Sequence, residues 1–526
     1  MIDKFLLPLL LSKFTYLHLT NNQNKEKPIT HGNINAQNRP TLKSSRLLAT
    51  QYWRKINILF DTTLLTDPSI ENEVYVKNTI LRSLKSILES IIYVRGSRTI
   101  EPFDDTICRE FLTVPNFYKE NSTEADLIIF VDIVERSDSI LATAAPCVVE
   151  QEIHRPVVGT ISINRRALKI SQTDLRAITN IMIHEVLHIF AVITFLYDLY
   201  NTEHHVYFRE RNRVTESNEF VYKLVTPKLL KAAKEHFGCD SLSGVYMEDG
   251  GTGASAGSHF EKIYFGNEII TARFSGYTPL SKMTLALLED TGWYKVDYGK
   301  AQYLGFGRNA GCSIFDNLCP TSLGEYCSET NTTGCTRDYL GKSRCRKDAF
   351  TNGCYIQDYV QEYMCTNKHN FQSTARHEQN GNYSRCFLLN TNNKNQSGCY
   401  KSTCEAGKIM IEIDNEVFEC STSNQIVKAK GVEIICPDIT DFCGLLAEAC
   451  PDDCNGRGIC LVDKTCRCDY LFTGASCNIT QGCHKDDDLI CKYLLNNTSD
   501  FVLGSIEMLL SNALWLILWV AIIINY

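Results

Sequence analysis

Positive charge is in short supply in this 526-residue chain: 53 lysines and arginines stand against 61 aspartates and glutamates, giving a formal net charge of −8. Binding to nucleic acid requires lysine and arginine concentrated against the phosphates, so nucleic acid is not expected as a partner. A glycine-rich phosphate-binding loop is also missing from the sequence, and this removes the usual signature of a nucleotide-dependent enzyme. The function must therefore be sought in other residue patterns.

Cysteine is nearly absent from the first 300 residues, where only Cys108, Cys147 and Cys239 occur; the other 21 of the 24 cysteines lie beyond them. This concentration of cysteines after residue 300 is expected of a loop-rich region with a small apolar core. Disulfides stabilise such a region in an oxidising compartment. Zinc bound by cysteines is the rival interpretation, but the spacings lack paired Cys-x-x-Cys knuckles. Glycosylation sequons agree with the secretory route and predict a glycoprotein. These sequons begin at Asn121, Asn331, Asn382, Asn395, Asn478 and Asn497.

One pentad carries the chemistry of this chain: His184-Glu185-Val186-Leu187-His188 lies inside an apolar run. On an α-helix, positions i and i+4 lie one turn apart on the same face, so the two histidines can point their imidazoles at one metal ion. The glutamate then lies beside a water activated by that metal and can act as a general base. The pattern predicts hydrolysis of a peptide bond by a zinc peptidase.

The alternative for this pentad is a core helix whose two histidines are satisfied by ordinary hydrogen bonds. Apolar residues recur at helical spacing from Leu175 to Phe190, and the Ser-Gln-Thr-Asp sequence at 171–174 has the form of a capping box. Burying two histidines and a glutamate in so apolar a helix is costly unless they have a partner. This cost favours a bound metal.

A third ligand is expected, because catalytic zinc usually keeps three protein ligands and leaves the fourth position to water. His259 is the candidate. It follows a glycine-dense stretch, 250–258, whose backbone can approach a site closely. Taken alone, this stretch is better explained as a flexible linker that carries an incidental histidine.

Four stretches besides the pentad make the chain resemble a leishmanolysin-type surface metallopeptidase, a branch of the metzincins. They are Gly-Ser-His-Phe-Glu-Lys at 257–262, Phe-Gly-Asn-Glu-Ile-Ile-Thr at 265–271, Met-Thr-Leu-Ala-Leu-Leu-Glu-Asp-Thr-Gly-Trp-Tyr at 283–294, and Gly-Arg-Asn-Ala-Gly-Cys at 307–312. The gap of 71 residues from His188 to His259 suits this branch, in which an inserted segment separates the third histidine from the helix. Short metzincins place that histidine about six residues after the second one. The resemblance extends from about residue 50 to about 440.

The resemblance implies an α+β fold: a metzincin-type zinc peptidase catalytic domain with an inserted central α/β lobe, then a disulfide-rich, mostly β C-terminal domain. It assigns His184, His188 and His259 as the ligands of one Zn2+ per chain and Glu185 as the general base. Protein or peptide substrates are expected to bind by adding a strand to the edge of a mixed sheet.

Two positions depart from the family pattern. Ala191 stands where the family has a glycine that turns the chain out of the helix. If this position needs a positive φ, alanine costs on the order of 1 kcal/mol, so the helix is expected to continue through Ile193 and Tyr197. The methionine beneath the zinc belongs at or near Leu285 in this register, with Met283 as a substitute.

Hydrophobic patterning upstream of the pentad predicts strands at 56–60, 127–134 and 157–164 and an amphipathic helix at 74–92. The cysteine spacing from 450 to 477 resembles an EGF-like module, a type that more often spaces domains or binds partners than performs chemistry. The predicted division is a signal peptide (1–20), a disordered pro-segment (21–49), an N-terminal catalytic lobe (50–193), a central lobe (194–311), a Cys-rich domain (312–442), the EGF-like module (443–480), a spacer (481–505) and a hydrophobic tail (506–526).

Both ends of the chain carry patterns typical of targeting signals. A charged start followed by apolar residues at 5–11 resembles a signal peptide. The tail is apolar throughout 513–524 and has the shape of a GPI attachment signal. A transmembrane anchor is the alternative, although it usually needs about 20 apolar residues flanked by basic ones. Both alternatives predict a cell-surface protein attached to the membrane through its C-terminal tail.

These patterns together predict a zinc-dependent endopeptidase at the cell surface that hydrolyses protein substrates through a Glu-activated, zinc-bound water. The competing hypothesis is a catalytically impaired homologue that acts as a cell-surface adhesion protein, as Ala191 and Leu285 suggest. Retention of Glu185 opposes it, because the base has no evident structural use on this helix face.

Overall fold

The computed structural model describes residues 41–42, 52–65, 73, 75–96, 98–104, 113–136, 140–150, 153–165, 168, 175–211, 220–249, 256–275, 277–328, 333–370, 372–391, 396–470 and 472–480. The predicted signal peptide, pro-segment, spacer and hydrophobic tail lie outside these residues, as do Cys108, the expected capping box and the stretch 250–255. Among the helices that are described, none has both the length and the apolar character required to cross a membrane.

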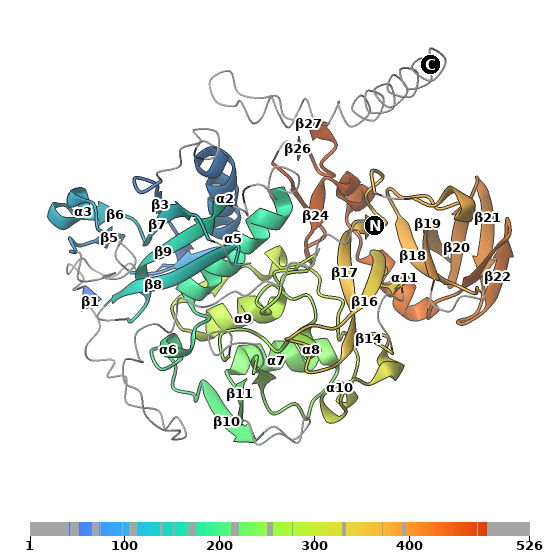
Figure 1. Cartoon of the computed structure of the whole chain (residues 1–526), viewed down its shortest axis with the longest axis horizontal. Coiled ribbons are helices and arrows are strands. Elements are labelled where there is room, and N and C mark those ends of the chain that lie inside the picture. The colour runs from blue at the N-terminus through green and yellow to red at the C-terminus, as the bar shows by residue number, and fades with distance from the viewer. Residues whose placement is uncertain are drawn as a thin grey trace, which may run out of the picture.

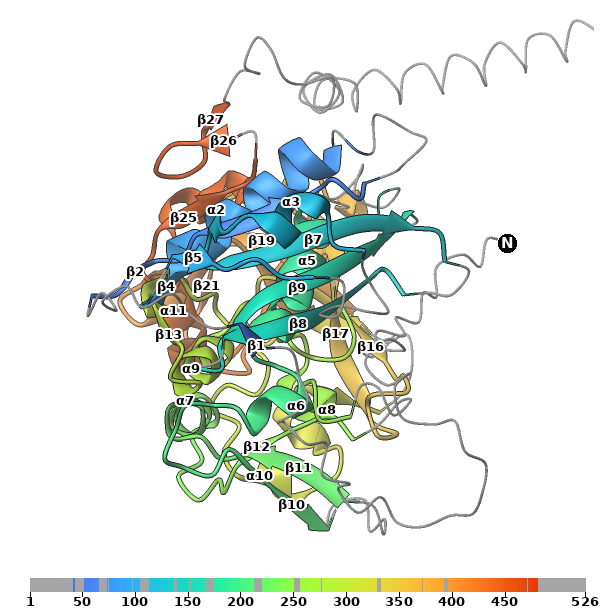
Figure 2. The same cartoon turned by 90° about the vertical axis from the view of Figure 1, so that its left-hand side faces the viewer.

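A mixed five-stranded sheet forms the N-terminal part of the molecule (Figure 1 and Figure 2). Its strands, in spatial order, are β1 (Thr41–Leu42), β8 (Ala142–Glu150), β9 (Pro156–Asn164), β7 (Leu127–Val134) and β3 (Ile58–Asp61). β3, β7 and β9 run parallel, whereas β8 is antiparallel to β9. The nearly continuous apolar sequence of β7 fits a strand that is buried on both faces.

Side chains alternate between the two faces of this sheet, and each face has its own core. Ile129 of β7 belongs to the larger core, which includes helices α2 (Leu81–Ile91) and α5 (Leu175–Phe190). Its neighbour Phe130 belongs to a smaller core on the other face, beside helix α3 (Asn116–Glu120). The sheet is thus covered on both faces, and α5 is held against it.

The strands and the helix predicted upstream of the pentad are confirmed to within about two residues at most ends. The predicted helix is a π-helical turn, η2 (Val76–Ile80), followed by α2. Strand β8 was not predicted. Its sequence contains Pro146 and several alanines, and these residues are uncommon in strands.

The chain between α5 and the C-terminal region folds into a central part that shares the larger core. Its elements are α6 (Thr194–Tyr197), β10 (Tyr207–Arg211), β11 (Phe220–Leu224), α7 (Pro227–Phe237), β12 (Val245–Tyr246), α8 (Lys262–Phe265), α9 (Lys282–Asp290), β13 (Tyr294–Val296) and α10 (Ser313–Asp316). The disulfide Cys239–Cys312 closes this part. β13 returns to the N-terminal part, where it pairs with β4 (Ile92–Val94). The short strands β2 (Arg54–Lys55), β5 (Thr99–Ile100) and β6 (Thr123–Glu124) complete the N-terminal part.

Two antiparallel sheets form the C-terminal region. The four-stranded sheet contains β14 (Tyr326–Cys327), β17 (Tyr355–Met364), β16 (Gly341–Arg346) and β15 (Thr333–Cys335). The six-stranded sheet contains β21 (Glu416–Cys420), β20 (Lys408–Ile413), β19 (Gln396–Glu405), β18 (Ser384–Leu389), β23 (Val432–Ile435) and β22 (Ile426–Ala429), and helix α11 (Ile439–Ala447) follows it.

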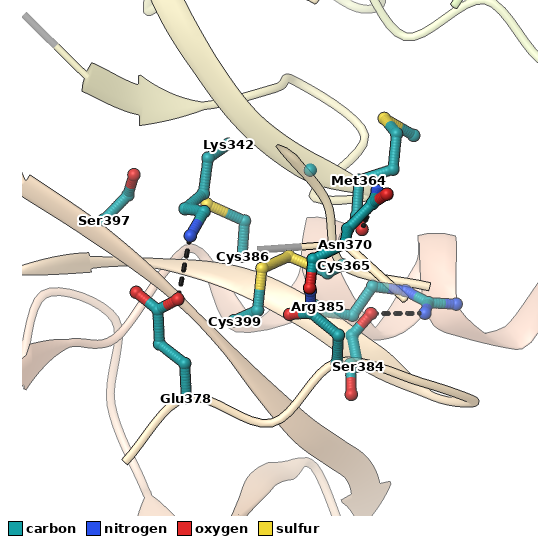
Figure 3. Close-up of a disulfide and its surroundings, with 12 residues drawn as sticks. Lys342, Met364, Cys365, Asn370, Glu378, Ser384, Arg385, Cys386, Ser397 and Cys399 are labelled. Atoms are coloured by element: carbon teal, nitrogen blue, oxygen red, sulfur yellow. Dashed lines mark hydrogen bonds and ion pairs between the residues drawn. A yellow bond between two sulfur atoms is a disulfide. The ribbon is translucent and has the colours of Figure 1, made fainter. Parts of the chain in front are cut away.

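Disulfides stabilise this C-terminal region, as its cysteine content predicts. They join Cys319 to Cys354, Cys327 to Cys345, Cys335 to Cys386, Cys365 to Cys399, Cys404 to Cys443 and Cys420 to Cys436. Figure 3 shows the Cys365–Cys399 disulfide near the ion pair between Lys342 and Glu378, whose Nζ and Oε2 atoms are 2.8 Å apart. Both charged side chains are buried, so a paired charge holds β16 against the loop before β18 in addition to the disulfides.

The last described segment, 450–480, is a small module of two hairpins. One hairpin pairs β24 (Gly458–Cys460) with β25 (Cys466–Cys468), and the other pairs β26 (Phe472–Thr473) with β27 (Ile479–Thr480). Its disulfides join Cys450 to Cys460, Cys454 to Cys466 and Cys468 to Cys477. A module this small has little apolar core, so its disulfides replace much of the stability that a core would supply.

Candidate metal centre

Helix α5 presents two of the predicted ligands from a buried position against the sheet. Gly159 of β9 permits this close approach, because a Cβ atom there would lie 2.7 Å from Cγ2 of Ile189. His184 and His188 are 2% and 8% exposed. The apolar sequence that predicts the helix therefore also places its histidines in the interior.

The structure brings His184, His188 and His259 together. The Nε2 atoms of His184 and His188 are 3.1 Å apart, and those of His259 and His184 are 3.3 Å apart. One ring nitrogen from each histidine lies within 4.8 Å of the others. Two residues separated by one helical turn and a third 71 positions later thus converge on one point.

Backbone carbonyls fix the orientation of two of these rings. His184 Nδ1 donates to the Ile269 carbonyl oxygen at 2.6 Å, and His188 Nδ1 donates to the Val192 carbonyl oxygen at 2.7 Å. A carbonyl only accepts, so each Nδ1 carries the proton and each Nε2 is left with a lone pair. Burial lowers the pKa of His184 to about 3 and that of His188 to about 4. The two rings are therefore neutral near pH 7.

This donor set fits a zinc ion. Two unprotonated nitrogens 3.1 Å apart repel each other unless a cation lies between them. Zn–N bonds of about 2.0–2.1 Å in a tetrahedral arrangement separate ligand nitrogens by about 3.3 Å. The observed Nε2 separations of 3.1 and 3.3 Å agree with that spacing. Hydrogen bonds to the outer nitrogens of such ligands are also typical of zinc sites.

Several backbone contacts hold the segment that carries His259. The carbonyl oxygen of His259 accepts from Glu248 N at 2.8 Å, and Phe260 N donates to Ile270 O at 3.1 Å. Tyr197 Oη donates to Gly257 O at 2.8 Å. The described part of the glycine-dense stretch is therefore an ordered support for His259, and the linker interpretation does not apply to it.

Glu185 directly follows His184 on α5 and is almost fully buried, with an exposed fraction of 2%. Its carboxylate accepts a hydrogen bond from the Ala144 backbone of β8. Its Oε1 atom has no hydrogen-bond partner in the described part of the chain. Burial raises the pKa of Glu185 to about 8, and a nearby cation would favour the carboxylate. The carboxyl group thus has one oxygen held by the sheet and one available.

Helix α5 ends at Phe190, which corrects the expectation of a helix continuing through Ile193 and Tyr197. Ile193 is extended, with φ −150° and ψ 140°, and the separate helix α6 follows it. Ala191 is not among the described residues with positive φ, so the turn requires no glycine. Tyr200 Oη donates to the Ala191 carbonyl at 3.2 Å. The chain therefore turns out of the helix after Phe190 without a glycine, with the help of a short turn and side-chain hydrogen bonds.

A turn whose role the sequence did not indicate contacts His184. Its residue Ile269 supplies the carbonyl that holds His184, and Glu268 anchors the turn. The buried Glu268 carboxylate accepts from Ile270 N at 2.6 Å and from Ser281 Oγ at 2.7 Å. The motif at 265–271 was noted for its family resemblance, but nothing in its pattern indicated that its backbone would touch a ligand.

The two candidates for a methionine beneath the zinc, at positions 283 and 285, lie in a helix. Leu285 and Met283 both lie in helix α9, and both are buried in the core. The segment whose backbone contacts His184 is the turn at Ile269 instead. The methionine expected beneath the zinc at Leu285 or Met283 stays a prediction from the sequence.

Three carboxylates, Glu248, Asp249 and Glu261, gather behind His259 with oxygen atoms within 4.8 Å of one another. Asp249 N donates to Glu261 at 3.3 Å, and Asn352 Nδ2 donates to both Asp249 and Glu261 at 3.3 and 3.4 Å. Burial and the neighbouring carboxylates raise the pKa of Glu261 well above its ordinary value. These contacts tie the segment carrying His259 to the C-terminal region.

Comparisons with known proteins agree with this geometry. A family model described as Leishmanolysin matches residues 64–361, which is more than half of the chain, and one described as a Teneurin-like EGF domain matches residues 450–480. The leishmanolysin-like peptidase of Drosophila pseudoobscura pseudoobscura is 25% identical over 415 residues, which cover 58% of this chain and 60% of that protein. The leishmanolysin of Leishmania chagasi is 28% identical over 288 residues, covering 53% and 44%.

The relative from Caenorhabditis briggsae, also a leishmanolysin-like peptidase, is 24% identical over 441 residues, which cover 62% of this chain and 66% of that protein. The chain therefore spans less than two thirds of the length of each of these relatives. The similarity includes the pentad, the segment around His259 and the turn at 265–271, since all three lie within residues 64–361.

Proposed function

The chain belongs to the leishmanolysin family, a family of zinc metalloendopeptidases, and from this premise we propose that it is a zinc-dependent endopeptidase acting on protein substrates. His184, His188 and His259 hold one zinc ion, and Glu185 is the general base. One observation carries the proposal: lone pairs of buried histidines converge at 3.1 to 3.3 Å beside a buried glutamate with a free oxygen.

The roles of the residues follow from their contacts. Zinc, when bound, supplies a Lewis acid that lowers the pKa of a water and polarises the scissile carbonyl. Glu185 takes a proton from the attacking water at its free Oε1 and returns it to the leaving amine. Ala144 keeps the other carboxylate oxygen in place. Ile269 and Val192 hold the imidazole rings, so the ligands are oriented before any substrate binds.

Strand β8 is the proposed binding site for an extended substrate. Its residues 142–146 pair with β9 on one side. In the described residues, β1 pairs on the other side only with Val149 and Glu150. The edge beside Glu185 can therefore accept a further strand, and main-chain hydrogen bonds would align the scissile bond with the site.

The proposed location is the cell surface. The C-terminal disulfides favour an oxidising compartment outside the cytosol. Attachment through the hydrophobic tail at 506–526, by a GPI anchor or a membrane span, remains a prediction from the sequence.

Cleavage of an unstructured protein by the purified chain tests the enzymatic proposal. We expect cleavage to disappear on chelation and to return with added zinc. Glu185→Gln is expected to lower kcat by about 10²- to 10⁴-fold, because it removes proton transfer, while the zinc content stays at one per chain. Glu235→Gln on the exposed surface of α7 is the matched control and should leave kcat unchanged.

Absence of cleavage by the zinc-loaded chain would support the adhesion hypothesis. If the zinc-loaded chain cut nothing, or if Glu185→Gln cut as fast as the unaltered protein, the proposed general base would be rejected. Of the two sequence features that favoured an inactive homologue, Ala191 carries little weight, because it adopts no positive φ.

A further inference from the structure

The EGF-like module (450–480) contacts the helix that carries two candidate ligands. Arg176, in the first turn of α5, donates from Nε to Asp469 Oδ1 at 3.2 Å and from Nη2 to Asp469 Oδ2 at 2.6 Å. Its Nη2 also lies 3.4 Å from the Gly458 carbonyl oxygen. β24 and α5 lie side by side in Figure 1. Arg176 precedes His184 by eight residues, about 12 Å along the helix.

A second contact joins the module to residues 301 and 302, which follow β13 and pair with the segment before α9. Leu461 and Gln302 form an antiparallel bridge, and Val462 N donates to Ala301 O at 3.0 Å. Gln302 is in turn paired with Leu280: its N donates to Leu280 O at 2.7 Å, and its Oε1 accepts from Leu280 N at 2.6 Å. Hydrogen bonds through residues 301 and 302 therefore connect the module to residue 280.

The same segment supports the turn behind His184. Ile269 N donates to Pro279 O at 3.0 Å, and the Ile269 carbonyl accepts from His184 Nδ1 at 2.6 Å. Asn180, one turn before His184 on α5, donates from Nδ2 to Thr278 O at 3.4 Å. Residues 278–280 thus lie between the EGF-like module and the carbonyl that orients a candidate ligand.

The module is itself fixed from the opposite side. Arg385 of β18 forms an ion pair with Asp453 through contacts of 2.8 and 2.9 Å, and the two side chains are only 5% and 6% exposed. Breaking a buried pair of this kind is strongly destabilising, because it leaves an uncompensated charge. The six-stranded sheet therefore holds the module in place while the module contacts α5.

We propose that the EGF-like module is a positioning element of the metal centre rather than a spacer, and that Asp469 is a positioning residue for His184. The module acts at two points. Asp469 fixes the start of α5, and Leu461 supports the segment behind Ile269. Hydrogen bonds that orient metal ligands raise metal affinity by about 10- to 100-fold. Asp469 acts through Arg176 and the helix, so its contribution is smaller. The inference rests on the proposed function, since it concerns the geometry of the zinc ligands.

Asp469→Asn in the full chain tests this inference. We expect its zinc dissociation constant, measured against a competing chelator, to rise about three- to tenfold, below the effect of a direct partner of a ligand. kcat at saturating zinc is expected to fall while KM is unchanged, because the substrate edge on β8 is not altered. Asp469→Glu keeps the charge and should restore most of the zinc affinity. Glu448→Gln breaks an exposed ion pair with Lys464 and is the matched control, expected to leave zinc affinity unchanged.

The outcomes separate this inference from the proposed function. If the unaltered chain binds zinc and cleaves protein, and Asp469→Asn does both equally well, the positioning role is wrong and the proposed function stands. A lower unfolding temperature with unchanged zinc affinity would also overturn it, because the module would then only stabilise the fold. If the unaltered chain binds no zinc, both proposals fail. Arg176→Gln removes the other partner of the same ion pair. If Asp469→Asn fails to fold, the zinc affinity of Arg176→Gln still tests the positioning role.

Discussion

Ala191 illustrates how a family departure at one residue is accommodated without strain. The chain leaves α5 through backbone hydrogen bonds from Ala191 N and Val192 N to the Leu187 carbonyl, each of 3.0 Å. The Val192 carbonyl then accepts from His188 Nδ1. The ligand itself therefore helps to cap its own helix, and the residue at 191 needs only an ordinary negative φ.

Ala191→Gly is consequently not expected to improve the enzyme. Glycine at a position with negative φ gains conformational freedom in the unfolded chain, so we expect a loss of about 0.5–1 kcal/mol in unfolding free energy. kcat should stay the same or fall slightly as the support of His188 loosens. Urea unfolding and cleavage assays measure both quantities. A marked gain in kcat would indicate that alanine distorts the site after all.

Glu185 makes the stability of the metal-free protein depend on pH. Its pKa is about 8 in the folded chain and 4.5 when exposed, so between these values the folded state keeps a proton that the unfolded state has released. The contribution of this carboxyl group to stability must then fall as pH rises from about 5 to about 9. We expect the chelated protein to lose this stability and chelated Glu185→Gln to retain it, as measured by urea unfolding across that range. An identical pH dependence for both proteins would contradict the buried carboxyl.

The two α5 histidines act in the opposite direction at lower pH. Their pKa values are lowered to about 3 and about 4 in the folded chain, from 6.5. Below about 6.5 the unfolded histidines bind protons that the folded ones do not, so stability is lost as pH falls from about 6.5 toward 4. The two effects overlap between about pH 5 and 6.5, where the two histidines outweigh the single glutamate, so the metal-free protein should be most stable near pH 6.5.

Among the helices and strands, the close approach of α5 to the sheet depends on the lack of a side chain at Gly159. A Cβ at Gly159 would meet Ile189 Cγ2 at 2.7 Å and the Ala145 carbonyl oxygen at 3.1 Å. Gly159→Ala should therefore reduce the unfolding free energy by about 1–3 kcal/mol through overpacking. Chemical denaturation gives this value directly.

A double-mutant cycle identifies the cause. In an Ile189→Ala background the clashing methyl group is gone, so Gly159→Ala should destabilise much less there. Gly444→Ala is the control, because Gly444 lies in α11 with open space around its Cα and no positive φ. It should be neutral or stabilise by up to about 1 kcal/mol. Equal costs for Gly159→Ala in both backgrounds would exclude contact with Ile189 as the reason.

At the scale of the whole molecule, the metal centre and the disulfides stabilise different regions. The proposed zinc ion joins α5 to the segment of His259, whereas Cys404–Cys443 and Cys420–Cys436 stabilise the six-stranded sheet. Chelation should therefore increase amide hydrogen exchange in the second half of α5 and in residues 256–261. Strands β19 and β20 should be unaffected. A uniform increase throughout the chain would show that zinc supports the fold as a single unit.

Features that depend on local pattern could be predicted from the amino-acid sequence. The spacing of the pentad placed His184 and His188 on one helix face, apolar runs identified β7 and β9, and cysteine spacing predicted the EGF-like module. Helical periodicity, burial of both strand faces and the tight loops of a disulfide-bonded module all act over a few residues. These features can therefore be predicted from the sequence without knowledge of the fold.

Tertiary structure alone decided the features that depend on contacts between distant residues. The end of α5, the turn of Ile269 behind His184 and the packing of Asp469 against Arg176 are examples. In the first two, a backbone carbonyl is the partner of a ligand, and every residue type carries one, so no sequence pattern marks it. In the third, the two residues are separated by 293 positions, and only the folded arrangement of the module brings their charges together.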